Sequence, residues 1–174
     1  MRPRFLLAPL VLVGSVAMAV STVTPRDVEN SIATTGARQT LQRIYEDKGQ
    51  WTALLAGIAT GEPVWLNLAK QLRRVSDGGA SEQIDLAAGE ALEHRPADVL
   101  TLVADEFGLP QVCGGPDVDD PRFDSYDLSM AAIQRRLEML HSIHDGGLAA
   151  KRAGCISELE KAKTGIAHFY KHGA

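Results

Sequence analysis

Two pairs of histidines are placed where they could bind a metal ion. His168 and His172 are four positions apart, and His141 and His144 are three apart, so each pair shares one face of a helix. Imidazole nitrogens at this spacing can hold one transition-metal ion. Cationic side chains are also typical of helix C-termini, where they face unpaired carbonyl groups. We favour this second interpretation and predict no metal site at either pair.

Five aspartates crowd into a short stretch in the second half of the chain. They are Asp117, Asp119, Asp120, Asp124 and Asp127. Calcium loops place oxygen ligands at alternating positions, include a glycine at a sharp turn and end with a bidentate glutamate. Pro121 stands where a third ligand is needed, and the glycine and the glutamate are missing. The pattern favours a solvated acidic loop in which Asp124 or Ser125 caps the next helix.

One further group could transfer protons. Glu90, Glu93 and His94 stand close together in a predicted helix, where a carboxylic acid and an imidazole could serve as an acid/base pair. Charged residues at these positions are more typical of the solvated side of an amphipathic helix. The sequence contains neither the G-x-S-x-G motif of serine hydrolases nor the H-E-x-x-H motif of zinc hydrolases. We predict a protein with no catalytic residues and no cofactor.

The two cysteines of the chain, Cys113 and Cys155, are 42 positions apart. An even cysteine count in an exported chain indicates a disulfide, whereas redox-active pairs are usually closely spaced. Closing a loop of this size stabilises the folded state by roughly 4 kcal/mol in the chain-entropy treatment. We predict a structural disulfide that ties the loop around Cys113 to the last helix.

The first 19 residues have the pattern of an export signal. Arg2 and Arg4 precede an apolar stretch, and the stretch closes on Ala17-Met18-Ala19, the small-x-small pattern that signal peptidase recognises. The apolar run is shorter than the roughly 20 residues that a membrane-spanning helix needs. We expect cleavage after Ala19 and a periplasmic or secreted product, residues 20–174, with no membrane insertion.

Charge and composition limit the classes of molecule that the chain is expected to bind. Loss of Arg2 and Arg4 with the leader changes the formal net charge from −4 to −6. An acidic chain repels nucleic-acid phosphates and anionic lipids. Aromatic residues make up only 5% of the sequence, too few to suggest a surface on which bases or sugars stack. These features favour another protein as the partner and exclude nucleic acid.

Apolar residues recur at three- and four-residue intervals through most of the chain, and no segment shows strand-like alternation. Thr24 and Pro25 start a first helix that breaks near Gly36, and Ser81 caps a later helix. Further helices are expected over residues 37–47, 51–58, 64–75, 96–107, 125–144 and 148–170. The prediction is an all-α single domain of about six to eight short antiparallel helices that ends in a long helical hairpin. Trp51 and Trp65 are expected in its core.

Several stretches are similar to a known group of proteins. The stretches are Gly61-Glu62-Pro63-Val64-Trp65-Leu66, Leu86-Ala87-Ala88, Ala91-Leu92, Arg95-Pro96-Ala97-Asp98-Val99-Leu100 and Val112-Cys113-Gly114. About a third of the chain resembles short, uncharacterised exported proteins of Gram-negative bacteria. The resemblance implies export and a helical fold, and it implies no activity and no site residues.

Export, a single disulfide and the lack of a catalytic motif favour a periplasmic helical binding protein without catalytic activity, such as an inhibitor, an immunity-type protein or an envelope accessory factor. Its contact surface is predicted at residues 116–127, through Asp117, Asp119, Asp120 and Asp124. Two alternatives remain open. One is a small envelope enzyme or metal-binding protein that uses His141, His144 and nearby acids, and the other is a structural spacer in an envelope assembly.

Overall fold

The structure, a computed structural model, describes residues 23–172. Within these residues all regular structure is helical, which confirms the predicted all-α class. The helices are α1 (Pro25–Thr35), α2 (Ala37–Glu46), α3 (Lys48–Ala59), α4 (Pro63–Arg73), α5 (Gly78–Glu90), η1 (Ala91–Glu93), α6 (Pro96–Leu102), α7 (Ala104–Phe107), α8 (Leu109–Val112), α9 (Tyr126–His141), η2 (Gly146–Leu148) and α10 (Ala149–His172). The predicted export signal, residues 1–19, and its cleavage site lie outside the described residues.

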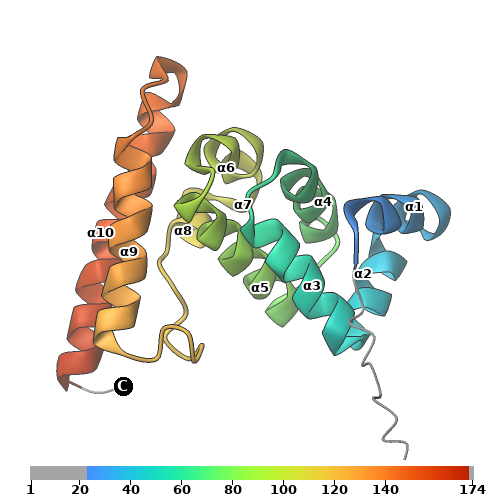
Figure 1. The fold of residues 1–174 in the computed structure, drawn as a ribbon, viewed down its shortest axis with the longest axis horizontal. Coiled ribbons are helices and arrows are strands. Elements are labelled where there is room, and N and C mark those ends of the chain that lie inside the picture. The colour runs from blue at the N-terminus through green and yellow to red at the C-terminus, as the bar shows by residue number, and fades with distance from the viewer. Residues whose placement is uncertain (1–22, 173–174) are drawn as a thin grey trace, which may run out of the picture.

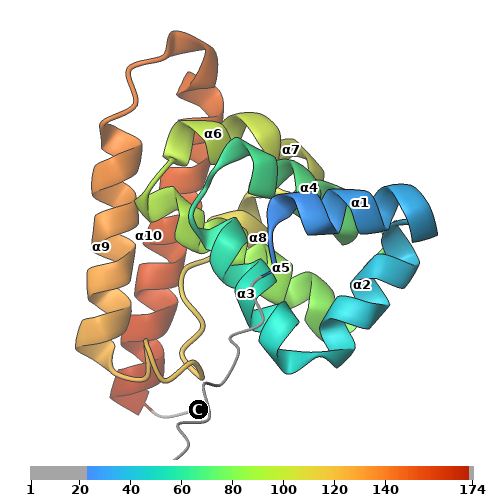
Figure 2. The ribbon, with the colours of Figure 1, turned by 45° about the vertical axis from the view of Figure 1, so that its right-hand side comes forward.

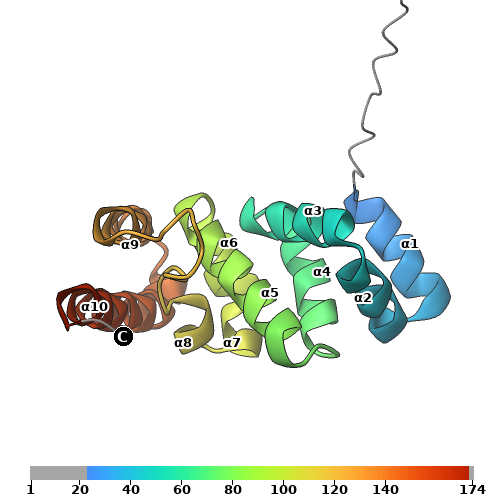
Figure 3. The ribbon, with the colours of Figure 1, turned by 90° about the horizontal axis from the view of Figure 1, so that it is seen from below.

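The helices follow one another along the long axis in approximate chain order (Figure 1). Helices α1 and α2 lie at one end, α3 to α8 form the middle, and α9 and α10 form an antiparallel hairpin at the other end (Figure 2). Seen from below, the hairpin lies beside α5, α6 and α8 (Figure 3). A long irregular stretch crosses between α8 and the start of α9, and we call it the α8–α9 segment (residues 113–125).

Local sequence signals set the start and end of the first helix as predicted. The Thr24 hydroxyl accepts a hydrogen bond from the backbone N–H of Asp27, and the Asp27 carboxylate accepts one from the backbone N–H of Thr24. This capping box and Pro25 at the first position satisfy the helix N-terminus. Gly36 ends the helix at a φ of 85°, a conformation that disfavours residues with a side chain.

The prediction that Ser81 caps a helix is wrong. Helix α5 starts three residues earlier, at Gly78, and Asp77 is the residue that precedes it. The Ser81 hydroxyl lies 2.8 Å from the hydroxyl of Ser76 instead of capping a backbone N–H. Two glycines at the start of a helix disfavour it by propensity, and packing of α5 against α3 and α4 outweighs that preference.

Leucine, isoleucine and alanine side chains from α3 to α6 form the centre of the core. Trp51 and Trp65 belong to it as predicted, each with 7% of its surface exposed. Gly57 allows α3 and α4 to approach closely, because a Cβ at this position would lie 2.4 Å from the indole ring of Trp65. The close approach of these two helices therefore depends on a residue without a side chain.

The predicted disulfide is present between Cys113 and Cys155, with an S–S distance of 2.04 Å and a Cα–Cα distance of 5.2 Å. It joins the beginning of the α8–α9 segment to α10. The predicted C-terminal hairpin is also present, since α9 packs along α10. In the described range none of the helices is long and apolar enough to cross a membrane.

The described residues contain ten α-helices, more than the six to eight that the sequence suggested. The extra helices are single turns. The helix expected over residues 96–107 is interrupted at Val103, which separates α6 from α7. Helix α8 is four residues long. Gly108 directly precedes it with a φ of 89°, and Pro110 is its second residue.

Candidate functional site

A cavity of about 560 Å³ lies between the α8–α9 segment and helices α3, α5 and α9. Its walls combine apolar and charged side chains. They are Trp51, Thr52, Leu55, Ala56 and Ala59 from α3, Gln83, Leu86, Ala87 and Glu90 from α5, Pro116, Asp117, Asp120, Arg122 and Phe123 from the segment, and Arg136 from α9. Ligand sites in proteins are typically concave and largely apolar with a few convergent polar groups.

Hydrogen bonds within the α8–α9 segment fix its path although it is not helical. The backbone N–H of Asp120 donates to the carbonyl of Asp117 at 3.3 Å, and that of Phe123 donates to the carbonyl of Asp120 at 2.7 Å. The Asp117 and Asp120 carboxylates accept from the N–H groups of Asp119 and Arg122, respectively. These are Asx-type turns, in which a short side chain replaces a backbone acceptor.

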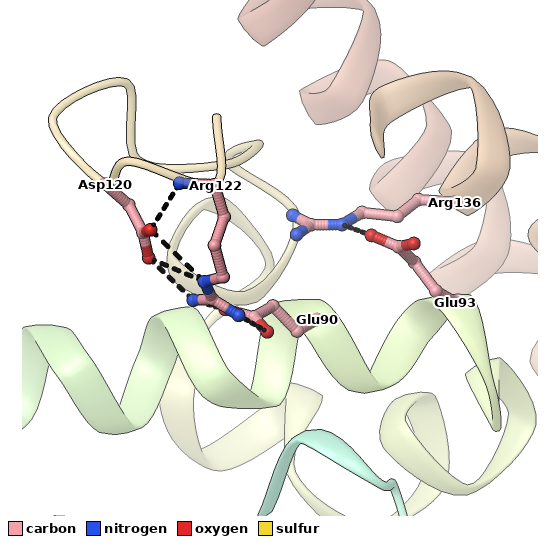
Figure 4. A network of polar contacts seen from close by, with 5 residues as sticks. All are labelled: Glu90, Glu93, Asp120, Arg122 and Arg136. Atoms are coloured by element: carbon pink, nitrogen blue, oxygen red, sulfur yellow. Dashed lines mark hydrogen bonds and ion pairs between the residues drawn. The ribbon is translucent and has the colours of Figure 1, made fainter. Parts of the chain in front are cut away.

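Arg122 ties the segment to α5. Its Nη1 and Nη2 donate to the two carboxylate oxygens of Glu90 at 2.8 and 2.7 Å, and its Nη2 also donates to Asp120 at 2.6 Å (Figure 4). The hydrogen bonds that Arg122 donates to Glu90 and, next in effect, to Asp120 raise the pKa of its guanidinium above its usual value. In return, the hydrogen bond from Arg122 lowers the pKa of the Asp120 carboxyl. The clamp is a bidentate arginine–carboxylate pair, the geometry in which ion pairs are strongest.

Arg136 is the most deeply buried charged side chain at the cavity, with 1% of its surface exposed. Its Nε lies 3.3 Å from the carboxylate of Glu93, and its two terminal nitrogens point away from Glu93 (Figure 4). The Nη1 atom is buried and has no hydrogen-bond partner among the described residues. Burial lowers the pKa of the Arg136 guanidinium, and the negative charge of Glu93 opposes this effect.

The Glu93 carboxylate forms ion pairs with two arginines of α9. It accepts from Arg135 Nε at 2.6 Å, a shorter bond than the one from Arg136. The expectation that Glu90 and Glu93 form a solvated helix face is therefore wrong, since the side chains are 21% and 14% exposed and both are paired with arginines. The segment and α9, which are distant in sequence, cover this part of α5 and η1. His94 of the same group is exposed.

The four aspartates of the predicted contact surface lie on the α8–α9 segment. Asp117, Asp119 and Asp124 are exposed, whereas Asp120 is half-buried and paired with Arg122. Ser125 caps α9 by accepting a hydrogen bond from the backbone N–H of Leu128, as the sequence suggested. Three of the four acids are thus exposed on a segment whose path is fixed by hydrogen bonds, and Asp117 also lines the cavity.

The two histidine pairs lie near the ends of their helices, as predicted. His141 is the last residue of α9, and His144 follows in the turn of the hairpin. The rings of His168 and His172 are 4.6 Å apart near the C-terminal end of α10. All four side chains are exposed, and residues 23–172 contain no cluster of three or more histidine, cysteine, aspartate or glutamate side chains suited to a metal ion.

Sequence reasoning missed Arg122 and Arg136, the two arginines of the cavity. Arg136 could have been noticed by its position in α9, because it is three residues after Ile133 and four before Leu140 and so lies on the apolar stripe. A charged residue on an apolar stripe indicates either a buried ion pair or a ligand-binding site. Arg122 carries no comparable signal, since its partner Glu90 is 32 positions away.

Comparison with known proteins identifies no relative of this chain. No family model matches the chain, and neither the curated proteins nor the solved structures include a significant match to it. The functional assignment therefore depends on the geometry of the site.

Proposed function

We propose that this chain is an exported binding protein without catalytic activity, which contacts another protein through the exposed acidic side chains of the α8–α9 segment. The observation that carries the proposal is the anchoring of this segment at both of its ends. The Cys113–Cys155 disulfide holds its start. Near its end, Arg122 is clamped to Glu90, and the carbonyl of Phe123 accepts a hydrogen bond from the buried hydroxyl of Ser129 at 2.6 Å.

An anchored irregular segment is suited to recognition because it is ordered before the partner arrives. Ordering a flexible loop on binding costs free energy, and a preformed surface avoids most of that cost. Three exposed carboxylates on this surface, those of Asp117, Asp119 and Asp124, favour a partner with a basic patch. The first 19 residues indicate export, which also supports the proposal. Exported proteins occupy an oxidising compartment, where the disulfide that anchors the segment persists.

Site-specific photo-crosslinking in the organism that encodes the protein tests this function. A photoreactive amino acid replaces Asp119 on the segment or, as a matched control, Glu29, which is exposed on α1. We expect a discrete crosslinked protein from position 119 and not from position 29. Crosslinking at 119 should fall with Asp117→Lys and Asp124→Lys together, and persist with Glu29→Lys and Glu46→Lys together.

Two results would overturn the proposal. One is the same set of crosslinks from both positions, and the other is a crosslink at 119 that the Asp117 and Asp124 charge reversals leave unchanged. The mass of the protein recovered from the periplasm or medium tests export separately. It should correspond to a chain that begins at Val20.

A further inference from the structure

The cavity under the α8–α9 segment has apolar sides and one charged end. Leu55 and Ala56 of α3 face it from one side, and Leu86 and Ala87 of α5 line it as well. Phe123 contributes a ring from the segment. Arg136 supplies the guanidinium at its α9 side, where the terminal nitrogens point away from Glu93 (Figure 4).

The other charged groups that line the cavity already have partners. Arg122 binds the carboxylates of Glu90 and Asp120. The Gln83 side-chain oxygen accepts a hydrogen bond from the indole N–H of Trp51. Among the described residues, Arg136 donates a hydrogen bond only through Nε, and its Nη1 is a buried donor without a partner.

An unused donor on a buried guanidinium is energetically unfavourable. A buried polar group without a hydrogen bond loses its interactions with water and gains nothing in exchange. Glu93 only partly compensates the charge, because it makes its shorter bond to Arg135. Guanidinium nitrogens accept no hydrogen bonds, so the missing partner must bring an acceptor.

We propose that this cavity binds a small ligand with an apolar body and an oxygen acceptor, a carbonyl or a carboxylate, that pairs with the terminal nitrogens of Arg136. The apolar body lies against the α3 and α5 side chains, and the oxygen lies at the α9 side. This site goes beyond the protein-binding function, because it depends on Arg136 and the apolar wall of the cavity, and that function depends on the exposed acids of the segment, of which only Asp117 also lines the cavity.

The charges around the site are compatible with either a carboxylate or a neutral carbonyl as the acceptor. A carboxylate can accept two parallel hydrogen bonds from a guanidinium, which makes it the stronger partner. Glu90 and Asp120 also line the cavity and oppose an added negative charge, although Arg122 neutralises part of theirs. A neutral carbonyl avoids this repulsion and makes weaker bonds. The test therefore includes one probe of each kind.

Titration followed by ¹H–¹⁵N NMR of the full oxidised protein tests the site. The probes are octanoate, octanamide and octylamine, which share one alkyl chain and differ in the head group. The indole N–H of Trp51 lies at the cavity and reports binding, and that of Trp65, which does not line it, is the internal reference. We expect saturable shifts of the Trp51 signal with octanoate, octanamide or both, and none with octylamine, whose ammonium offers no acceptor.

A pair of variants assigns the interaction to Arg136. Arg136→Met retains much of the side-chain length and removes the donors, and Arg135→Met is the matched control because Arg135 also binds Glu93 from α9. We expect affinity to fall at least tenfold in Arg136→Met and to stay within twofold in Arg135→Met. Equal affinity in the two variants, equal binding of octylamine, or no Trp51 shift with any probe would overturn the proposal.

Discussion

Arg136 places a cation in the interior with an incomplete set of partners. Its side chain is 1% exposed, its Nη1 has no partner among residues 23–172, and the carboxylate that it contacts is shared with Arg135. Replacing a buried charged residue by an apolar one of similar size is often neutral or stabilising, provided that no opposite charge is left alone. Here Glu93 retains Arg135 as a partner. The residue that we place in a ligand site therefore destabilises the unliganded fold.

The variant Arg136→Met is accordingly expected to raise the free energy of unfolding by about 1 kcal/mol. Arg135→Met removes a partly exposed ion pair and should change it by less than about 1 kcal/mol. Urea denaturation of the oxidised proteins measures both. If Arg136→Met loses more stability than Arg135→Met, then Arg136 stabilises the fold, and its burial gives no support to a ligand site.

The Arg122 clamp makes part of the stability depend on pH. The hydrogen bond from Arg122 lowers the pKa of Asp120 in the folded protein below the value of about 3.9 of a free aspartate. The stabilising contribution of the ionised carboxylate is complete above that value and is lost as the pH falls through the lower folded pKa. NMR titration of the Asp120 carboxyl carbon should give a midpoint below 3.9 in the wild type and a higher one in Arg122→Gln. Equal midpoints would contradict the clamp.

At the scale of helices and segments, predictions succeeded where the signal was local. The helix start at Thr24 and Pro25 follows from a few neighbouring residues, and the disulfide follows from the cysteine count and general chemistry. The prediction failed at Ser81, because packing of α5 on its neighbours extended the helix over two glycines. It also failed for the Glu90 and Glu93 side chains, because the residues that cover them come from distant parts of the sequence.

Packing of α3 against α4 depends on Gly57. In Gly57→Ala, the new methyl group would lie 2.4 Å from the indole ring of Trp65, so the helices must separate or the ring must move. We expect a loss of about 2 kcal/mol in unfolding free energy, in spite of the better helix propensity of alanine. Gly165→Ala in α10 is the control, because among the described residues no atom beyond its chain neighbours and its own helix backbone lies within 4 Å of the new methyl group, and it should stabilise by about 0.5–1 kcal/mol. Equal effects of the two changes in thermal or urea unfolding would contradict the close packing.

Across the described molecule, a disulfide and several ion pairs, among them Lys151 of α10 with Asp105 of α7, join the C-terminal hairpin to the rest. The Cys113–Cys155 disulfide ties the α8–α9 segment to α10, and Glu93 of η1 pairs with two arginines of α9. The cavity lies where these parts meet, so its shape depends on the whole fold. No single stretch of sequence encodes it, and for this reason the sequence indicated the acidic segment and not the cavity behind it.

Removal of the disulfide should weaken the whole fold. A loop of this length is expected to contribute about 4 kcal/mol by restricting the unfolded chain. The double variant Cys113→Ala and Cys155→Ala should therefore unfold at a markedly lower urea concentration than the oxidised wild type. Wild-type protein treated with a reductant should behave like the double variant. Unchanged midpoints would show that the bond does not restrain the chain.

We predict that the α8–α9 segment is a fixed surface before any partner binds. Amide hydrogen exchange of the oxidised protein, followed residue by residue with NMR, tests it directly. The N–H groups of Asp119, Asp120, Arg122 and Phe123 donate hydrogen bonds within the segment. They should exchange at least about tenfold more slowly than an unstructured chain, which corresponds to an opening free energy of about 1.4 kcal/mol or more. Exchange of these four amides at the rate of an unstructured peptide would contradict the claim.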